Sequence, residues 1–148
     1  VGVIYDPHQD EMFSARRDAG ATLNGRPMQV SGESKIANSL LVTGFPPSAN
    51  EELEANLLNF AELTRRSRGI RRLGSAALDL AYTAAGRLDG FWEYGLNPWD
   101  TAAGYLLVEE AGGRVTKIDG EPFDIHSPSI LATNGRIHDE IVDILDHL

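Results

Sequence analysis

The sequence predicts a mixed α/β fold formed as one unit of 148 residues. Short segments rich in β-branched side chains alternate with Ala- and Leu-rich segments of helical length, and turns containing Gly or Pro separate them. The composition, with 42% hydrophobic and 24% charged residues, is that of an ordinary folded domain. A chain of this length buries about two-thirds of the surface that its unfolded form exposes, so it can form a core without disulfides.

The first third of the chain is predicted to form an antiparallel β meander. Two strong turn dipeptides, Asp6-Pro7 and Asn24-Gly25, separate its apolar segments. The strands expected here are residues 1–5, 11–16 and 29–30. No turn or cap precedes the first strand, so we expect the given sequence to start in the middle of a folded domain.

The rest of the chain is predicted to alternate strands with helices. Residues 50–66 follow the breaker Gly44-Phe45-Pro46-Pro47, and apolar side chains recur there with helical spacing, which predicts an amphipathic surface helix. Those side chains are Leu53, Leu57, Phe60 and Leu63. The other helices expected are residues 76–85, 98–111 and 137–148. The other strands expected are residues 39–43, 70–72, 88–93, 114–117 and 130–132.

The composition excludes several classes of function. The chain has no Cys, which excludes disulfides, thiolate catalysis and Cys-based zinc sites. A formal net charge of -9 argues against a nucleic-acid or anionic-membrane surface spread over the whole molecule. No apolar run reaches the length of about 18 residues that a membrane span needs. We therefore expect a cytoplasmic protein that binds neither nucleic acid nor membrane.

The most informative stretch is residues 97–104, Asn-Pro-Trp-Asp-Thr-Ala-Ala-Gly. Asn97 is a favoured N-cap and Pro98 suits the first helical position, which puts Asp100 in the first turn. The free backbone amides and the helix dipole favour a carboxylate there, and also a nearby phosphate. A merely favourable charge at a helix start is the simpler explanation. We favour a metal ligand, because the helix is apolar almost all round and would hold Asp100 on a buried, rigid element.

Two further candidates precede Asp100. Ser75 is a natural N-cap ahead of Ala76, and Gly74 lets a ligand approach the backbone closely, so a polyol or phosphate oxygen could bind there. Ordinary capping also explains Ser75 fully. Glu93 ends an apolar strand, and a short loop to Asp100 could bring both carboxylates to one cleft. A solvated strand end is an equally good explanation of Glu93.

Five arginines form a basic cluster on an otherwise acidic chain. They are Arg65, Arg66, Arg68, Arg71 and Arg72. A solvated helix end or a dimer interface is favoured for them over a second phosphate site. The four His residues show no metal-ligand spacing, and we expect them at the surface. They are His8, His126, His138 and His147.

Motifs spread over the whole chain form one pattern. They are Gly20-Ala21-Thr22-Leu23-Asn24-Gly25, Gly44-Phe45-Pro46, Gly74-Ser75-Ala76-Ala77, Asp89-Gly90, Trp99-Asp100-Thr101-Ala102-Ala103-Gly104 and Glu110-Ala111-Gly112-Gly113. The Trp99-Asp100 motif is specific, whereas the turns are weaker signals. The pattern resembles the inositol monophosphatase family, especially its bacterial members.

The resemblance implies a fold, an activity and a set of site residues. The fold implied is a layered αβαβα sandwich with mixed sheets. The activity implied is Mg²⁺-dependent hydrolysis of a phosphate monoester of a small polyol or sugar, with inositol 1-phosphate the first substrate to try, in a homodimeric enzyme. Asp100 would be a magnesium ligand, Glu93 would hydrogen-bond substrate hydroxyls, and Gly74, Ser75 and Ala76 would line the substrate site.

One departure from the family pattern limits what these residues could do alone. The family's other metal-binding elements, a glutamate on a helix and an Asp-Pro-x-Asp-Gly-[Thr/Ser] loop, lie upstream of the region that this chain resembles. Residues 1–148 are therefore expected to be the C-terminal part of a single catalytic domain, inactive by themselves, because one carboxylate cannot hold magnesium tightly.

Other functions stay open from the sequence. A fructose-1,6-bisphosphatase or a nucleotide 3'-phosphatase of the same superfamily is one alternative, and a non-catalytic binding or assembly module is another. A hydrolase with Ser75 as its nucleophile is disfavoured, because no Gly-x-Ser-x-Gly elbow is present.

Overall fold

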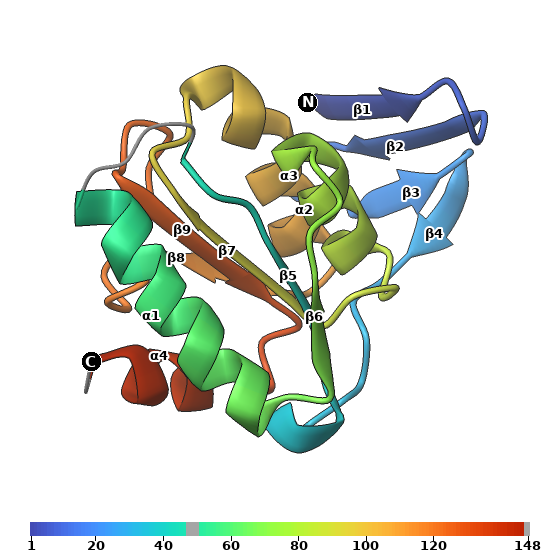
Figure 1. Cartoon of the computed structure of the whole chain (residues 1–148). Helices are drawn as coiled ribbons and strands as arrows, with labels where there is room; N and C mark the ends of the chain where they lie inside the picture. The colour runs from blue at the N-terminus through green and yellow to red at the C-terminus, as the bar shows by residue number, and fades with distance from the viewer. Residues whose placement is uncertain (47–50, 147–148) are drawn as a thin grey trace.

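Two β-sheets alternate with helices in residues 1–46 and 51–146, which are the residues that the computed structural model describes (Figure 1). The first sheet has four antiparallel strands in chain order. They are β1 (Gly2–Asp6), β2 (Glu11–Ala15), β3 (Ala21–Leu23) and β4 (Arg26–Met28). The predicted meander is therefore present in the first third of the chain.

A strand expected at residues 29–30 is wrong. Asn24 and Gly25 both have positive φ, as a two-residue hairpin turn requires, and the turn pairs Leu23 directly with Arg26. The strands therefore flank the turn itself, as β3 and β4. The N–H of Val30 instead donates to the carbonyl of Ala111, which ties this segment to the end of a helix.

The second sheet has five strands in the order β6-β5-β7-β9-β8. They are β5 (Leu40–Thr43), β6 (Gly69–Arg71), β7 (Gly90–Tyr94), β8 (Arg114–Thr116) and β9 (Ser129–Thr133). Strand β5 runs parallel to both of its neighbours, whereas β9 runs antiparallel to β7 and β8. The sheet is therefore mixed, as expected.

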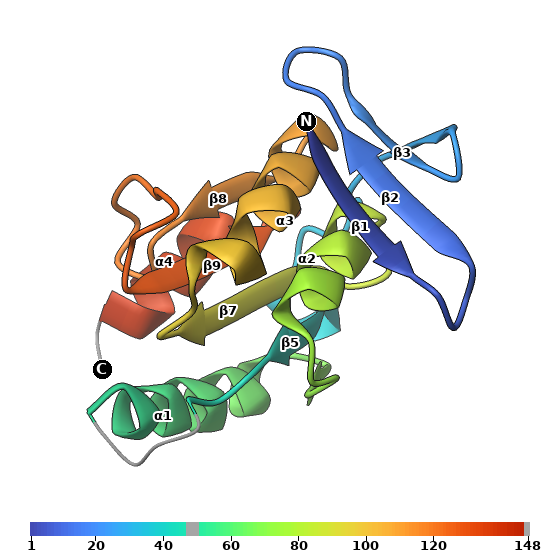
Figure 2. The ribbon, with the colours of Figure 1, turned by 90° about the horizontal axis from the view of Figure 1, so that it is seen from above.

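The helices lie in two layers. They are α1 (Glu51–Arg66), α2 (Ala76–Ala84), α3 (Pro98–Glu110) and α4 (His138–Asp146), with a short 3₁₀ helix at Ile36–Asn38. Helices α2 and α3 lie between the two sheets, and α1 and α4 cover the opposite face of the second sheet (Figure 2). The described residues thus form a layered mixed sandwich in the order β, α, β, α, which confirms the predicted fold class. No helix among them combines the length and the apolar character that a membrane span needs.

Two apolar clusters hold these layers together. The cluster around α2 and α3 includes Phe13 of the first sheet and Phe91 of the second. The two helices approach each other closely at Gly104, where a Cβ would lie 2.6 Å from the Cβ of Leu80. This close contact near the middle of both helices fixes the spacing between α2 and α3, because close-packed interiors resist even small added groups.

The face that α1 buries differs from the apolar stripe predicted for it. Leu63 is buried as expected, but Leu57 is 45% exposed and Asn56 is fully buried. The Asn56 side chain accepts a hydrogen bond from the indole N–H of the buried Trp92 at 2.6 Å and donates to the carbonyl of Gly44 at 2.6 Å. A buried indole N–H needs a partner, so polar residues occupy this face of the helix. Asn50, where the helix was predicted to begin, lies outside the described residues.

His138 contradicts the expectation that the histidines lie at the surface. Its ring is completely buried, with Nε2 2.8 Å from the hydroxyl of Thr116 and Nδ1 2.9 Å from the hydroxyl of Thr133. Burial lowers the pKa of His138 to about 4, because the charged imidazolium would lose its hydration. Helix α4 begins at this residue, and His147 lies outside the described residues.

Candidate functional site

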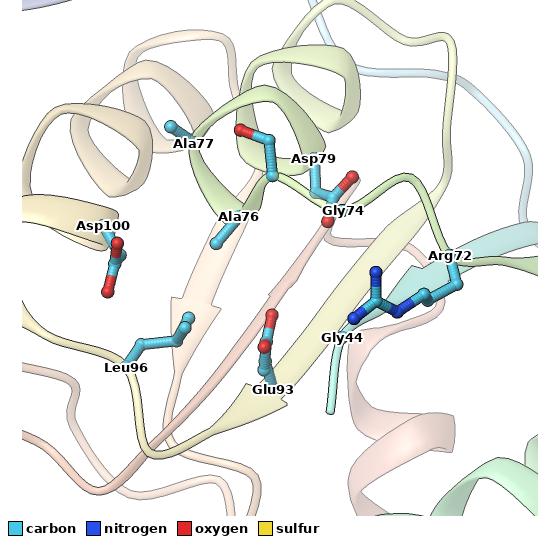
Figure 3. A pocket seen from close by; sticks show the side chains of 10 residues that line it. Gly44, Arg72, Gly74, Ala76, Ala77, Asp79, Glu93, Leu96 and Asp100 are labelled. Carbon is cyan, nitrogen blue, oxygen red and sulfur yellow. The ribbon is translucent and has the colours of Figure 1, made fainter. Parts of the chain in front are cut away.

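One pocket, with a volume of about 350 Å³, lies where the N-termini of α2 and α3 approach the ends of β5 and β7 (Figure 3). The five residues expected from the sequence to bind metal or substrate all line it: Gly74, Ser75, Ala76, Glu93 and Asp100. The structure therefore brings these residues together, and their individual roles stay predictions.

Asp100 is held by the start of α3. Helix α3 begins at Pro98 with Asn97 as the N-cap, as predicted. The Oδ2 atom of Asp100 accepts a hydrogen bond from the backbone N–H of Asn97 at 2.9 Å, which fixes the carboxylate at the mouth of the pocket. Among the described residues, its Oδ1 atom has no hydrogen-bond partner and is free to bind a ligand. The neighbouring Trp99 is 79% exposed.

The start of α2 forms the opposite wall. Ser75 is the N-cap, and its hydroxyl accepts a hydrogen bond from the N–H of Leu78 at 3.3 Å. Gly74 has a φ of 94°, a conformation that a side chain would strain. Ordinary capping therefore accounts for Ser75, and the first residues of the helix, Ala76 and Ala77, line the pocket as well. The first amides of a helix have no partner within the helix and are available as donors.

Glu93 lies at the floor, near the end of β7. It is 8% exposed, and burial raises the pKa of its carboxyl to about 7, with a further contribution from the charge of Asp79. The Arg72 guanidinium acts in the opposite direction. The carboxylate lies against the backbone of Gly44, where a Cβ would be 2.6 Å from the carboxylate carbon. The position of the Glu93 carboxylate therefore requires a glycine at residue 44, because any side chain there would collide with it.

Five other residues line the same pocket and were not predicted as site residues: Gly44, Arg72, Ala77, Asp79 and Leu96. Asp79 is the only acid in an otherwise Ala- and Leu-rich helix, which was a usable signal. In the sequence, Arg72 stands out only as a member of the basic cluster. Gly44 was recognised only as part of a turn, because its contact with Glu93 joins segments that are far apart in the chain.

The basic cluster does not act as one unit. Arg65 and Arg66 both pair with Glu62 on the same helix, at 3.2 and 2.6 Å. Arg72 instead points into the pocket beside Glu93 (Figure 3), and it makes no ion pair or hydrogen bond with a described residue. The helix-end interpretation therefore fits two of the five arginines.

The described residues supply only part of what a magnesium ion needs. No group of three or more His, Cys, Asp or Glu side chains in the described residues is arranged to hold a metal ion. Magnesium is typically bound through one or two carboxylates together with waters and substrate phosphate. Asp100 fits one such position, and the remaining ligands would have to come from outside these residues.

Comparisons with known proteins agree with the fold and the motifs. The chain is 51% identical over 145 residues to the Inositol-1-monophosphatase of Synechocystis sp., and the match covers 98% of this chain and 50% of that protein. It is 48% identical over 136 residues to the Nus factor SuhB of Pseudomonas aeruginosa, covering 90% of this chain and 50% of that protein. The chain thus spans about half the length of the curated relatives that it matches.

A solved structure of a relative has the same fold as this chain. The inositol monophosphatase from Anabaena (Nostoc) sp. superposes with a TM-score of 0.91 at 50% sequence identity, covering 99% of this chain and 58% of that one. The model of the inositol monophosphatase family matches residues 1–147. This chain belongs to the inositol monophosphatase family.

Proposed function

We propose that this chain forms the substrate-binding part of a magnesium-dependent phosphomonoesterase, and that residues 1–148 are the C-terminal part of one catalytic domain. The observation that carries the proposal is the single pocket lined by Asp100, Glu93 and the N-terminus of α2. The proposed substrate is a phosphate monoester of a small polyol or sugar, with inositol 1-phosphate the first to test. Membership of the inositol monophosphatase family supports this choice.

Each wall of the pocket has a proposed task. Asp100 supplies one carboxylate oxygen to a magnesium ion, and the remaining ligands come from the rest of the protein and the substrate. When bound, the ion would activate a water and polarise the phosphoryl group. The amides at the start of α2 bind an oxygen of the substrate, and Glu93 accepts hydrogen bonds from its hydroxyls.

A second candidate function is a non-catalytic binding or assembly role. It is favoured by the relative named Nus factor SuhB, which matches this chain at 48% identity. A fructose-1,6-bisphosphatase or a nucleotide 3'-phosphatase would need a second phosphate contact, for which the unpaired Arg72 is the candidate. The homodimeric state and the cytoplasmic location expected above stay predictions.

Removal of magnesium is expected to stop phosphate release by the complete protein. Because one carboxylate cannot retain the ion tightly, treatment with EDTA should lower the rate with inositol 1-phosphate to background. Adding excess Mg²⁺ should restore the rate, whereas Ca²⁺ should not. The measurement is phosphate release under each condition. Hydrolysis that resists the chelator would contradict the magnesium assignment, and no hydrolysis of any monoester would favour the binding role.

Gly44→Ala is expected to weaken recognition of the polyol more than the chemistry. The added methyl group would displace the Glu93 carboxylate, which lies against Gly44. We expect kcat/KM for inositol 1-phosphate to fall by about tenfold, with a smaller loss for an aryl phosphate that has no hydroxyls. Gly32→Ala is the matched control, because nothing lies within 4 Å of a Cβ there. Equal losses on both substrates would place Glu93 in the chemistry or in folding.

A further inference from the structure

Asp79 is a buried carboxyl group that is not fully hydrogen-bonded within the described residues. The residue is 1% exposed, and its Oδ1 atom has no hydrogen-bond partner in the described part of the chain. Two other buried carboxyl groups in the described part of the chain, those of Asp6 and Asp89, have hydrogen-bond partners. Asp89, for example, accepts hydrogen bonds from the Ser31 hydroxyl at 2.5 Å and from the N–H of Leu40 at 2.7 Å. The isolation of Asp79 therefore needs an explanation of its own.

Asp79 faces the pocket that holds the candidate site. It lines this pocket together with Glu93 and Arg72. Figure 3 shows the side chains of Asp79 and Glu93 pointing into the same space from α2 and β7, with the Arg72 guanidinium beside Glu93. A ligand in this space would meet two carboxyl groups from opposite sides.

Burial without a partner destabilises the folded protein. A buried, unpartnered polar group loses its hydration and gains nothing in return. Desolvation raises the pKa of Asp79 to about 7, and the charge of Arg72 only partly opposes this effect. An apolar residue of similar shape would fit an Ala- and Leu-rich helix better. The cost of Asp79 to the fold is therefore explained if a ligand supplies the missing hydrogen bonds.

We propose that Asp79 is a specificity-determining residue of this pocket, whose carboxyl group hydrogen-bonds a substrate hydroxyl next to the one bound by Glu93. The proposal rests on the proposed function, because it takes the ligand to be a polyol or sugar phosphate. The two carboxyl groups together would select a substrate with two neighbouring hydroxyls. A carboxyl group that is protonated part of the time near neutral pH can either donate to a hydroxyl or accept from it.

The charges in the pocket favour hydroxyls over other ligand groups at this position. A phosphate beside Asp79 and Glu93 would be repelled by both carboxylates. An ammonium group would be attracted by them but repelled by Arg72, which lines the same pocket. A hydroxyl is neutral, and it can donate to one carboxyl group while accepting from another. The volume of about 350 Å³ is at the small end of the range of about 300 to 1,000 Å³ for small-molecule pockets.

The test uses Asp79→Leu and Asp79→Asn in the complete protein. Leu branches at the same carbon as Asp, is larger and removes both polar oxygens, whereas Asn keeps the size and shape with partial hydrogen-bonding ability. We expect Asp79→Leu to raise KM for inositol 1-phosphate by about tenfold or more, with little change for an aryl phosphate, and Asp79→Asn to have a smaller effect. Glu121→Gln is the control, because Glu121 is an exposed acid that does not line the pocket.

Deoxy analogues of inositol 1-phosphate identify the hydroxyl. For one analogue, wild-type and Asp79→Leu proteins should have the same KM, because the hydroxyl read by Asp79 is already missing. A different analogue should remove the difference between wild-type and Glu93→Gln proteins. If no analogue does so for Asp79→Leu, the proposal is overturned.

Thermal melting separates this role from a structural one. The Asp79→Leu protein should melt at a higher temperature than wild type at pH 8, because an unsatisfied charge is removed from the interior. This gain in melting temperature should shrink as the pH falls from about 7 toward 3.8. Over this range the Asp79 carboxyl group of the wild type becomes protonated in the folded protein while it is still ionised in the unfolded chain, which stabilises the wild type. The other charged groups facing this pocket are Glu93, Arg72 and Asp100, which all variants keep. A lower melting temperature with equal losses on both substrates would overturn the proposal.

Failure of the proposed function gives a different result. A wild-type protein that releases no phosphate but binds inositol 1-phosphate in calorimetry would overturn the enzymatic proposal alone. The dissociation constants of wild-type and Asp79→Leu proteins then decide the role of Asp79, and equal constants would refute it. A wild-type protein that neither hydrolyses nor binds the polyol phosphate would refute both.

Discussion

Asp100→Asn is expected to lower phosphate release by the complete protein about 100-fold or more, with little change in stability. The amide removes the negative charge that the proposed magnesium ion needs. Its oxygen can still accept the hydrogen bond from the N–H of Asn97, so the start of α3 is kept. Only the favourable charge at the helix N-terminus is lost, which costs about 0.3–1 kcal/mol. Steady-state kinetics with saturating Mg²⁺ and thermal melting provide the measurements.

Asp139→Asn is the matched control for this experiment. Asp139 also lies in the first turn of a helix, but at α4, where its exposed carboxylate pairs with Arg114. Its replacement should cost a similar small amount of stability and no activity. Near-normal turnover of the Asp100→Asn protein would mean that Asp100 holds no catalytic metal. A loss of folding in that variant alone would mean that the carboxylate is mainly structural.

Acidification is expected to destabilise the fold through His138 by about 3 kcal/mol. The pKa of His138 is about 4 in the folded protein and 6.5 for an ordinary histidine, and each unit corresponds to about 1.4 kcal/mol. Between these values the unfolded chain binds more protons than the folded one. The contribution of His138 to the free energy of unfolding is therefore full above pH 6.5 and declines as the pH falls to about 4.

Two pocket carboxyl groups act in the opposite direction, so the effect must be measured as a difference. Asp79 and Glu93 have raised pKa values and stabilise the folded state as the pH falls. Urea unfolding of wild-type and His138→Gln proteins from pH 8 to pH 4 isolates the histidine. The wild type should lose more stability than the variant over this range, and His126→Gln, at an exposed position, should behave as wild type. Parallel curves for wild type and His138→Gln would refute the assignment.

The sequence predicted those parts of the fold that local residues determine. The start of α3 depends on Asn97, Pro98 and Asp100, which are neighbours in the chain, and it was placed correctly. The prediction of the buried face of α1 was wrong. The polar side chain of Asn56 is buried because it makes hydrogen bonds with Gly44 and Trp92, which are distant in the sequence. His138 was misjudged for the same reason, since its partners come from two separate strands.

The candidate site likewise contains some residues that the local sequence indicates and others that only the folded structure reveals. The three segments that supply Ser75, Glu93 and Asp100 could be recognised individually, because each begins a helix or ends a strand. The sequence marks Asp79 only as the single acid of an Ala- and Leu-rich helix, and the packing of α2 is needed to show that it is buried with an oxygen that lacks a partner in the described residues. The contact between Gly44 and Glu93 joins two strands that are neighbours only in the folded sheet.

The contrast between the two tryptophans has a practical consequence. Trp92 is completely buried and donates its indole N–H to Asn56, whereas Trp99 stands in solvent beside Asp100. Their fluorescence can therefore be separated by an aqueous quencher such as iodide, which reaches the exposed ring and not the buried one. The emission of Trp92 is expected to follow the docking of α1 on the second sheet, and that of Trp99 to follow changes at the first turn of α3, which also holds Asp100. The chain thus carries separate optical probes of its folding and of its site without any added label.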